Sequence, residues 1–150
     1  LGVLVQSNHG KLEDLTVDGI RLGAGLAVRN LGDTPVDRGS IIMIIATDLP
    51  CSDRQLGRII KRASVGLARL GSYVGHGSGE IMVGFSTARR IPHTATQDIV
   101  ACREMSESRI DLAFRAVAEA TEEAVLNSMV CAEPATRLDG QIVHSLKEFL

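Results

Sequence analysis

The pattern of apolar and polar residues predicts a protein in which strands and helices alternate. Residues 2–7 and 15–22 have the composition of strands, and the Asp18-Gly19 dipeptide predicts a bend or hairpin within the second. Residues 40–48, which read SIIMIIATD, form an apolar run without alternation, as expected of a central strand that is buried on both faces. Residues 80–87 predict one more strand.

Two stretches have the spacing of amphipathic helices. Residues 52–55 (SDRQ) match a capping box, and the apolar residues that follow keep helical spacing up to Gly71, which predicts a single helix. Residues 108–130 predict a second, longer helix. A turn at Asp139-Gly140 and a short helix in the tail follow, and the order of the elements predicts a layered α/β sandwich with helices covering a sheet.

Residues 23–39 show neither the helical nor the strand spacing of apolar residues. They contain several glycines, a proline and a polar run, and therefore predict a long surface loop. Loops of more than about 12–15 residues inside a compact domain are usually functional or disordered. A functional explanation for the length of this loop is therefore sought in the residues at its end. The loop ends at Gly39, directly before the strand that Ser40 begins.

The position of Ser40 suggests a function for this loop. If the Gly39–Ser40 bond is cut, Ser40 becomes a chain terminus, and its α-amino group lies beside its own hydroxyl. An α-amino group holds its proton less tightly than a lysine side chain does, so part of it is neutral near pH 7 and can act as a base. The alternative is that Ser40 simply begins a strand, because Gly-Ser is a common dipeptide.

Three further polar residues lie next to predicted strands. Ser78 and Glu80 are two residues apart, so in extended backbone their side chains project to the same face and can form a hydroxyl–carboxylate pair. The alternative is a turn-forming serine and a solvated glutamate, and Asn8 can likewise be a turn residue after a strand. The glycines around Ser78 form no dinucleotide fingerprint, because Glu80 stands where its third glycine belongs and a strand follows.

Composition and charge narrow the class of protein. The 150 residues, of which 45% are hydrophobic and 23% charged, are typical of one globular domain. A net charge of -2 does not favour nucleic acid or an anionic membrane as a partner. The longest apolar run is also far shorter than the ~20 residues that span a bilayer, so no membrane is expected.

Cysteine and histidine spacing argues against metal and cofactor sites. Cys51, Cys102 and Cys131 are an odd number without a C-x-x-C pair, which fits reduced thiols in the cytoplasm. The four histidines form no H-E-x-x-H or H-x-x-x-H motif. The sequence therefore predicts neither a metal nor a cofactor.

Four segments together resemble one family of enzymes. They are, in chain order, GVLVQSNHG at 2–10, GSIIMIIATDLP at 39–50, VGLARLGSYVGHGSGEIMVGFST at 65–87 and AEPATRLDG at 132–140. They are similar to the second half of the L-aminopeptidase D-esterase/amidase family, which includes the β-peptidyl aminopeptidases. The resemblance implies an αββα sandwich like that of N-terminal-nucleophile hydrolases, of which this chain, a single incomplete domain, is the carboxy-terminal part.

The resemblance also implies roles for the candidate residues. Self-cleavage would fall between Gly39 and Ser40, so that residues 1–39 end the larger subunit and residues 40–150 form the smaller one. Ser40 would be the nucleophile. Ser78 and Glu80 would support and activate that nucleophile. Asn8 would donate a hydrogen bond to the oxyanion.

The implied activity is release of amino-terminal residues from peptides, amides or esters with a free amino end, through an acyl-enzyme and without a cofactor. The implied partners are the missing amino-terminal segment and further processed copies, in a cytoplasmic homo-oligomer. Two alternatives stay open at this point. One is an acyltransferase of related fold that passes the acyl group to an amine, and the other is a truncated, unprocessed domain without catalytic activity.

Overall fold

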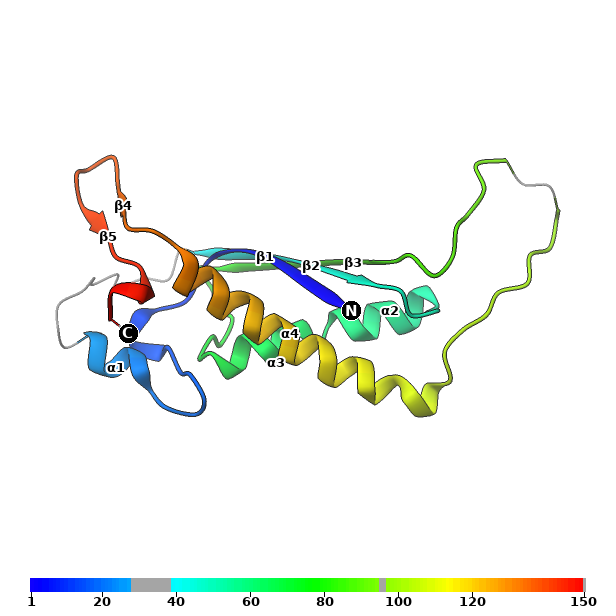
Figure 1. Ribbon diagram of the computed structural model, residues 1–150, viewed down its shortest axis with the longest axis horizontal. Coiled ribbons are helices and arrows are strands. Elements are labelled where there is room, and N and C mark those ends of the chain that lie inside the picture. The colour runs from blue at the N-terminus through cyan, green and yellow to red at the C-terminus, as the bar shows by residue number, and fades with distance from the viewer. Residues whose placement is uncertain (28–38, 95–96, 150) are drawn as a thin grey trace.

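A three-stranded sheet is the centre of the structure, a computed structural model that describes residues 1–27, 39–94 and 97–149. The strands follow one another across the sheet as β1 (Gly2–Asn8), β2 (Ser40–Thr47) and β3 (Gly79–Ser86). β1 runs antiparallel to β2, and β2 runs parallel to β3. β2 is therefore the central strand, as its apolar run predicts (Figure 1).

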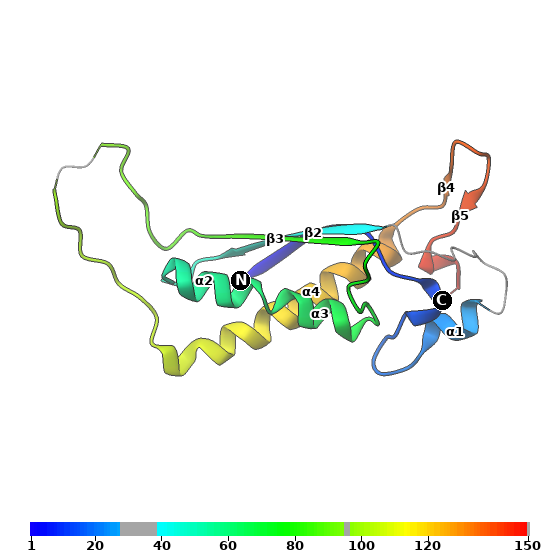
Figure 2. The ribbon, with the colours of Figure 1, turned by 180° about the vertical axis from the view of Figure 1, so that it is seen from behind.

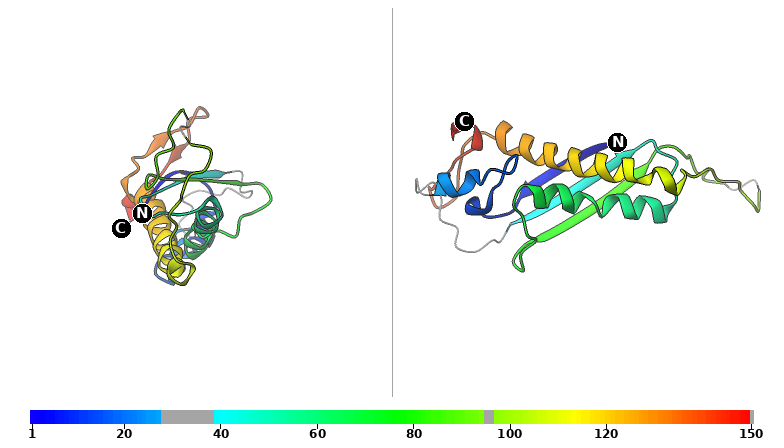
Figure 3. Two further views of the ribbon diagram at one scale, coloured as in Figure 1. Left: turned by 90° about the vertical axis from the view of Figure 1, so that its right-hand side faces the viewer. Right: turned by 90° about the horizontal axis from the view of Figure 1, so that it is seen from below.

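Helices α2 (Asp53–Ile60), α3 (Ala63–Arg69) and α4 (Ile110–Cys131) cover one face of this sheet (Figures 1 and 2). Figure 3 shows α4 lying beside α2 and α3 in a single layer under the strands. Buried and exposed residues alternate along β2. The β2 residues that pack into the hydrophobic core with the helices are Ile41, Met43 and Ile45.

The opposite face of the sheet is open. Ile42 and Ile44 of β2 project from it and are each 37% exposed. Among the described residues, no helix covers this face. The prediction that β2 is buried on both faces is therefore wrong for the chain as described, because the helices pack on one side only. The predicted α/β class, with helices layered on a sheet, is confirmed.

The helix expected to run up to Gly71 is in fact two helices. The predicted capping box is present, with 3.4 Å from the Gln55 N–H nitrogen to Ser52 Oγ and 3.2 Å from the Ser52 nitrogen to Gln55 Oε1. At Arg62, however, the N–H donates to the Ile59 carbonyl three residues back. This tighter turn separates α2 from α3. Gly71 has a φ of +95° and follows α3 as a C-terminal stop, as predicted.

The strand predicted at residues 15–22 is not present. Val17 and Ile20 form a single isolated bridge, and Asp18 and Gly19 turn the chain between them with φ values of 49° and 75°. Two positive φ values in succession are typical of the tight turn that Asp-Gly favours. The bend is confirmed, but the residues on either side of it are too few to make a strand.

The loop predicted at residues 23–39 begins with a helix instead. Helix α1 covers Leu22–Ala27 and packs near the 3-10 helix Leu12–Asp14. The prediction is wrong for these residues. The rest of that loop, residues 28–38, lies outside the described residues.

The long helix α4 is anchored at its start. A 3-10 turn, Glu107–Arg109, precedes it, and the Glu107 carboxylate accepts hydrogen bonds from Gln55, Arg54 and Arg58 of α2. The hydrogen bonds from Gln55 and Arg54 hold the pKa of Glu107 below its ordinary value. This cluster joins α2 to the beginning of α4.

The remaining segments extend beyond this core. Between β3 and α4 the chain runs out from the body as a long arm, which includes residues 87–94 and 97–106 (Figure 1). After α4, strands β4 (Ala135–Thr136) and β5 (Ile142–Val143) pair across the predicted Asp139-Gly140 turn, and the 3-10 helix Leu146–Phe149 ends the described tail. No described helix combines the length and the apolar character needed to cross a bilayer.

Candidate active site

The four candidate residues meet at one edge of the main sheet. β1 ends at Asn8, β2 begins at Ser40, and β3 begins at Gly79, which lies between Ser78 and Glu80. The strand register pairs Asn8 with Ser40, and Ser40 with Gly79. Ser40 therefore lies between the other candidates, on the central strand.

Asn8 and Ser40 share the open face of the sheet. They are directly opposite each other in the antiparallel pair. Side chains of opposed residues project to the same face, with Cβ atoms about 4.5–5.5 Å apart. Both residues are exposed, on the side away from the helices. A carboxamide beside a hydroxyl can offer a nucleophile together with a neutral N–H donor, which is the combination that an acyl-transfer reaction requires.

Gly79 leaves one flank of the Ser40 hydroxyl uncovered. A Cβ built on Gly79 would lie 3.7 Å from Ser40 Oγ, which is an ordinary van der Waals contact. Because Gly79 has no side chain, that space stays open beside the hydroxyl. In the sequence this glycine is only part of a flexible loop, because the contact depends on the pairing of two strands.

The hydroxyl–carboxylate pair predicted from sequence spacing is present. Ser78 Oγ donates to Glu80 Oε1 at 3.1 Å, and the same oxygen lies 3.2 Å from the Gly75 carbonyl oxygen. The Ser78 N–H also donates to the Gly75 carbonyl, at 3.0 Å. Ser78 and Glu80 are both half-buried. The turn that begins at Gly75 thus holds Ser78, and Ser78 in turn orients the carboxylate.

The Ser78–Glu80 pair and the Ser40 hydroxyl lie on opposite faces of the sheet. Glu80 is paired with Ile41, whose side chain is buried among the helices, whereas Ser40 is paired with Gly79. Successive side chains of a strand alternate between faces, so Glu80 lies on the helix side and Ser40 on the open side. The Glu80 side chain and the Ser40 hydroxyl therefore lie on opposite faces of the sheet, near the start of β2. The two-residue spacing of Ser78 and Glu80 carries no information on this difference.

The residue before Ser40 is in unusually close contact with β1. A Cβ built on Gly39 would lie 1.9 Å from the Asn8 carbonyl oxygen and 2.6 Å from the His9 Cα. Only a glycine allows the two backbones to approach this closely. Gly39, Ser40 and Asn8 are thus held together by main-chain packing as well as by strand pairing.

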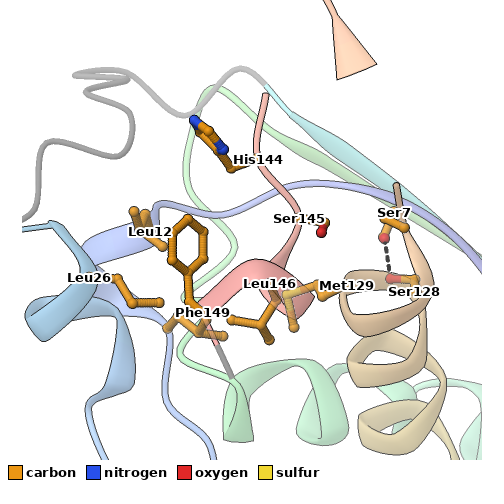
Figure 4. Close-up of a pocket in the computed structure, with 11 residues that line it drawn as sticks. Ser7, Leu12, Leu26, Ser128, Met129, His144, Ser145, Leu146 and Phe149 are labelled. Atoms are coloured by element: carbon orange, nitrogen blue, oxygen red, sulfur yellow. Dashed lines mark hydrogen bonds between the residues drawn. The ribbon is translucent and has the colours of Figure 1, made fainter. Parts of the chain in front are cut away.

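A pair of serines that the sequence pattern does not reveal ties the end of β1 to α4. The Ser7 and Ser128 hydroxyl oxygens are 2.6 Å apart (Figure 4). Ser128 donates to the Val125 carbonyl at 2.7 Å. The Ser128 proton is used in this second bond, so Ser7 is the donor in the first. Ser7 directly precedes Asn8, and the tie therefore restrains the part of β1 that carries it. No local signal predicts this contact, because the partners are 121 residues apart.

A cavity of about 280 Å³ opens beside this tie, on the helix side of β1 (Figure 4). Its apolar lining includes Leu12, Leu26, Met129, Leu146 and Phe149. Ser7 lines the cavity, whereas Asn8, the next residue of the strand, projects to the other face. The cavity is therefore distinct from the open face on which the Ser40 hydroxyl lies.

Metal-binding clusters and reactive thiols are two further kinds of site that the described residues could form. Among them, no cluster of three or more His, Cys, Asp or Glu side chains could hold a metal ion. Cys51, Cys102 and Cys131 are free. Burial raises the pKa of the Cys51 thiol, which keeps it protonated. A protonated thiol is a weak nucleophile, so the environment of Cys51 does not favour a catalytic role.

Comparison with known proteins decides the family. The model of peptidase family S58 matches residues 1–143. The chain belongs to peptidase family S58. Among curated family relatives, the β-peptidyl aminopeptidase BapA of Sphingosinicella microcystinivorans is 36% identical over 160 residues, and the alignment covers 97% of this chain and 40% of that protein. This chain thus spans about two fifths of the length of that relative.

Solved structures agree with this S58 assignment. The PH0078 protein of Pyrococcus horikoshii OT3 is 46% identical with a TM-score of 0.86, over 98% of this chain and 40% of that one. The L-aminopeptidase D-Ala-esterase/amidase of Ochrobactrum anthropi, described as a new variant of the Ntn hydrolase fold, is 33% identical with a TM-score of 0.85, over 96% and 39%. The resemblance stated from the sequence segments is confirmed, and so is an α/β fold related to that of the Ntn hydrolases.

Proposed function

We propose that this chain is the carboxy-terminal part of a self-processing serine aminopeptidase or amidase. The observation that carries the proposal is the pairing of Asn8 with Ser40 at the sheet edge, directly after Gly39, in a chain of family S58. Relatives named as β-peptidyl aminopeptidase and as L-aminopeptidase D-Ala-esterase/amidase support peptides, amides and esters with a free amino end as substrates.

The first proposed reaction is cleavage of the chain itself. Ser40 Oγ attacks the carbonyl carbon of Gly39, and Asn8 donates to the oxyanion that forms. The carbon–nitrogen bond between Gly39 and Ser40 then breaks, and the nitrogen takes up the proton that the hydroxyl lost. The product is an ester beside a free α-amino group. Water hydrolyses the ester to a Gly39 carboxylate and restores the Ser40 hydroxyl.

The second reaction is turnover of substrate. The freed α-amino group accepts the proton of the Ser40 hydroxyl while the oxygen attacks the substrate carbonyl carbon. Asn8 again donates to the oxyanion. The ammonium then gives its proton to the leaving nitrogen or oxygen, and the acyl group stays on Ser40 as an ester. Water, deprotonated by the same amino group, releases the acid and the enzyme.

The Ser78–Glu80 pair supports the amino group in this proposal. The carboxylate lies on the helix side of the sheet, near the start of β2, and in the proposed mechanism it stabilises the α-amino group in its protonated form. Ser78 fixes the direction of that carboxylate through the 3.1 Å hydrogen bond. Both residues are thus assigned to proton management, and Asn8 to charge stabilisation on the opposite face.

The proposed mature protein contains two subunits, one ending with residues 1–39 and a smaller one of residues 40–150. The part of the protein that precedes this chain covers the open face of the sheet, which completes the αββα sandwich. Support comes from the alignment, which spans 40% of the curated relative, and from the apolar side chains that project from this face. Those side chains are Leu4, Ile42, Ile44, Ile81, Val83 and Phe85.

Assembly and location follow as parts of the same proposal. The processed pairs of subunits associate into a homo-oligomer, for which the arm between β3 and α4 offers exposed apolar residues, Ile91, Ile99 and Val100. The enzyme functions in the cytoplasm, which is consistent with three free cysteines.

The decisive experiment uses the intact protein and its Ser40→Ala variant. Mass spectrometry of the wild-type protein should show a new amino terminus at Ser40. Ser40→Ala should abolish that cleavage and lower the turnover of amino-acid amides and β-peptides by on the order of 10⁴-fold or more, because one hydroxyl performs both attacks. Ser106→Ala, which removes an exposed hydroxyl before α4, is the matched control and should change neither.

Three outcomes would contradict the proposal. An active enzyme with an intact Gly39–Ser40 bond would exclude self-cleavage as the source of the nucleophile. An uncut protein without turnover would favour a non-catalytic domain. Transfer of the acyl group to an added amine in preference to water, measured by product analysis with and without the acceptor, would favour an acyltransferase.

A further inference from the structure

The main chain of Gly39 packs against the main chain at the end of β1. A Cβ at this position would lie 1.9 Å from the Asn8 carbonyl oxygen and 2.6 Å from the His9 Cα, both closer than the 3.0 Å below which something must shift. The obstructing atoms belong to the backbone, which does not rotate away as the end of a side chain can. A side chain at position 39 must therefore displace either β1 or residue 39 itself.

The end of β1 is held in place by two contacts. Asn8 is held opposite Ser40 at the last position of the strand ladder. Ser7, the residue before it, is tied to Ser128 of α4 at 2.6 Å. Gly39 lies directly before the first residue of β2. An added side chain should therefore shift residue 39, and with it the carbonyl carbon that Ser40 attacks.

We infer that Gly39 is a positioning residue for self-cleavage and for no later step. Its missing side chain lets the Gly39–Ser40 bond lie against Asn8, so any side chain there blocks maturation without impairing turnover. The inference rests on the function proposed above. A displacement of about 1 Å in a reacting group can cost about 10²-fold in rate. After cleavage, residue 39 is the end of a subunit and can rotate away from β1.

Of the two glycines next to Ser40, Gly39 alone lacks room for a side chain. The other neighbour of the nucleophile, Gly79, would place a Cβ at an ordinary 3.7 Å from Ser40 Oγ. Gly2, in the same strand as Asn8, would place a Cβ with nothing within 4 Å. A methyl group is thus accommodated at those two positions and excluded at position 39.

The test compares Gly39→Ala in two forms of the complete protein. In the intact precursor, the rate at which the residue 40–150 fragment appears should fall by about 10²-fold or more. In the second form the protein is produced as two chains, one ending at the substituted position 39 and the other beginning at Ser40. There, kcat on amino-acid amides should stay within about twofold of the two-chain protein with Gly39. Gly2→Ala is the matched control and should leave both rates unchanged.

A third comparison separates positioning from folding. In the uncut Ser40→Ala background, adding Gly39→Ala should preserve the circular dichroism spectrum and a cooperative thermal transition. An unfolded double variant would overturn the inference, because Gly39 would then serve folding. A Gly39→Ala precursor that is cut at the wild-type rate would also overturn it, as would an equal loss of kcat in the two-chain form. If wild-type precursor is never cut, the proposed function fails instead.

Discussion

On the covered face of β2, Ile41, Met43 and Ile45 pack with the helices and are at most 1% exposed, whereas Ile42 and Ile44 on the open face are each 37% exposed. The two sets alternate along one strand, so the sequence composition of the two faces is nearly the same. The difference comes from what packs on each face. The covered face stabilises this chain, and the open face carries Ser40 and its surroundings.

The candidate site is divided between these faces. Asn8 and Ser40 project from the open face, where a substrate carbonyl can be attacked and its oxyanion bound. Ser78 and Glu80 are half-buried, and Glu80 is paired with a residue that faces the helices. In the proposed mechanism, the Glu80 carboxylate on the covered side can influence the amino group of Ser40 without meeting the oxyanion, which it would repel. In that mechanism, the sheet lies between the Glu80 carboxylate and the oxyanion.

The largest expected effect is on the covered face. Ile45→Ala should lower the free energy of unfolding by about 2–5 kcal/mol, because it leaves a cavity in a packed core. The measurement is denaturant unfolding of the intact protein in the uncut Ser40→Ala background. Ile91→Ala, on the arm and 77% exposed, is the matched control and should change stability by less than about 0.5 kcal/mol. Equal effects of the two variants would contradict the assignment of the core.

On the open face, Asn8→Ala should lower kcat by about 10²–10³-fold and change KM much less, because an oxyanion donor acts mainly in the transition state. Asn8→Asp should be slower still, since a carboxylate repels the oxyanion. Steady-state kinetics on the two-chain form avoid the need for self-cleavage. Gln6→Ala, two residues earlier on the same face, is the control. A raised KM with unchanged kcat would assign Asn8 to substrate binding or turn geometry.

Glu80→Gln should lower kcat by on the order of 10²-fold, because it keeps the size of the side chain and removes the charge that supports the proposed acid–base group, the Ser40 amino group. It should also move the acidic limb of the pH–rate profile to lower pH, since an ammonium without a nearby carboxylate loses its proton more easily. Glu123→Gln, exposed on α4, is the control. An unchanged rate and profile in a processed, folded variant would reduce Glu80 to a structural residue.

Ile44→Ala tests whether the open face is covered in the intact protein. If the preceding part of the protein packs there, the substitution should cost about 2 kcal/mol of unfolding free energy, toward the lower end of the range for buried residues. The assay is the same denaturant unfolding in the Ser40→Ala background. A change below about 0.5 kcal/mol would mean that this face stays in contact with solvent, and would contradict the proposed sandwich.

The smallest effect is expected at Glu107. Its pKa is lowered by hydrogen bonds from Gln55 and Arg54, so the unfolded chain binds the proton more tightly than the folded one. The stabilisation is therefore present at neutral pH and is lost as the pH falls below the ordinary range of a glutamate. Glu107→Gln should lower the thermal midpoint slightly at pH 7 and not at strongly acidic pH. A pH-independent difference would contradict an ionic origin. Glu119→Gln, exposed on α4, is the control.

Most elements and the residues of the candidate site could be predicted from the sequence, but several boundaries could not. The capping box at Ser52 was predictable because its hydrogen bonds join residues three positions apart. The break at Arg62 and the helix at Leu22–Ala27 were not, because neither is marked by a proline or by a change of period. The Ser78–Glu80 contact was predictable from spacing, whereas the face on which it lies was not.

Local chemistry along the chain was enough to indicate strands, turns, caps and a serine preceded by glycine, because each of these depends on residues a few positions apart. The meeting of Asn8, Ser40 and Gly79 at one edge depends instead on the register of three strands. The tie between Ser7 and Ser128 depends on how α4 packs under β1. Such contacts join segments distant in sequence, so only the folded chain decides which side chains share a face and how closely Gly39 approaches its neighbours.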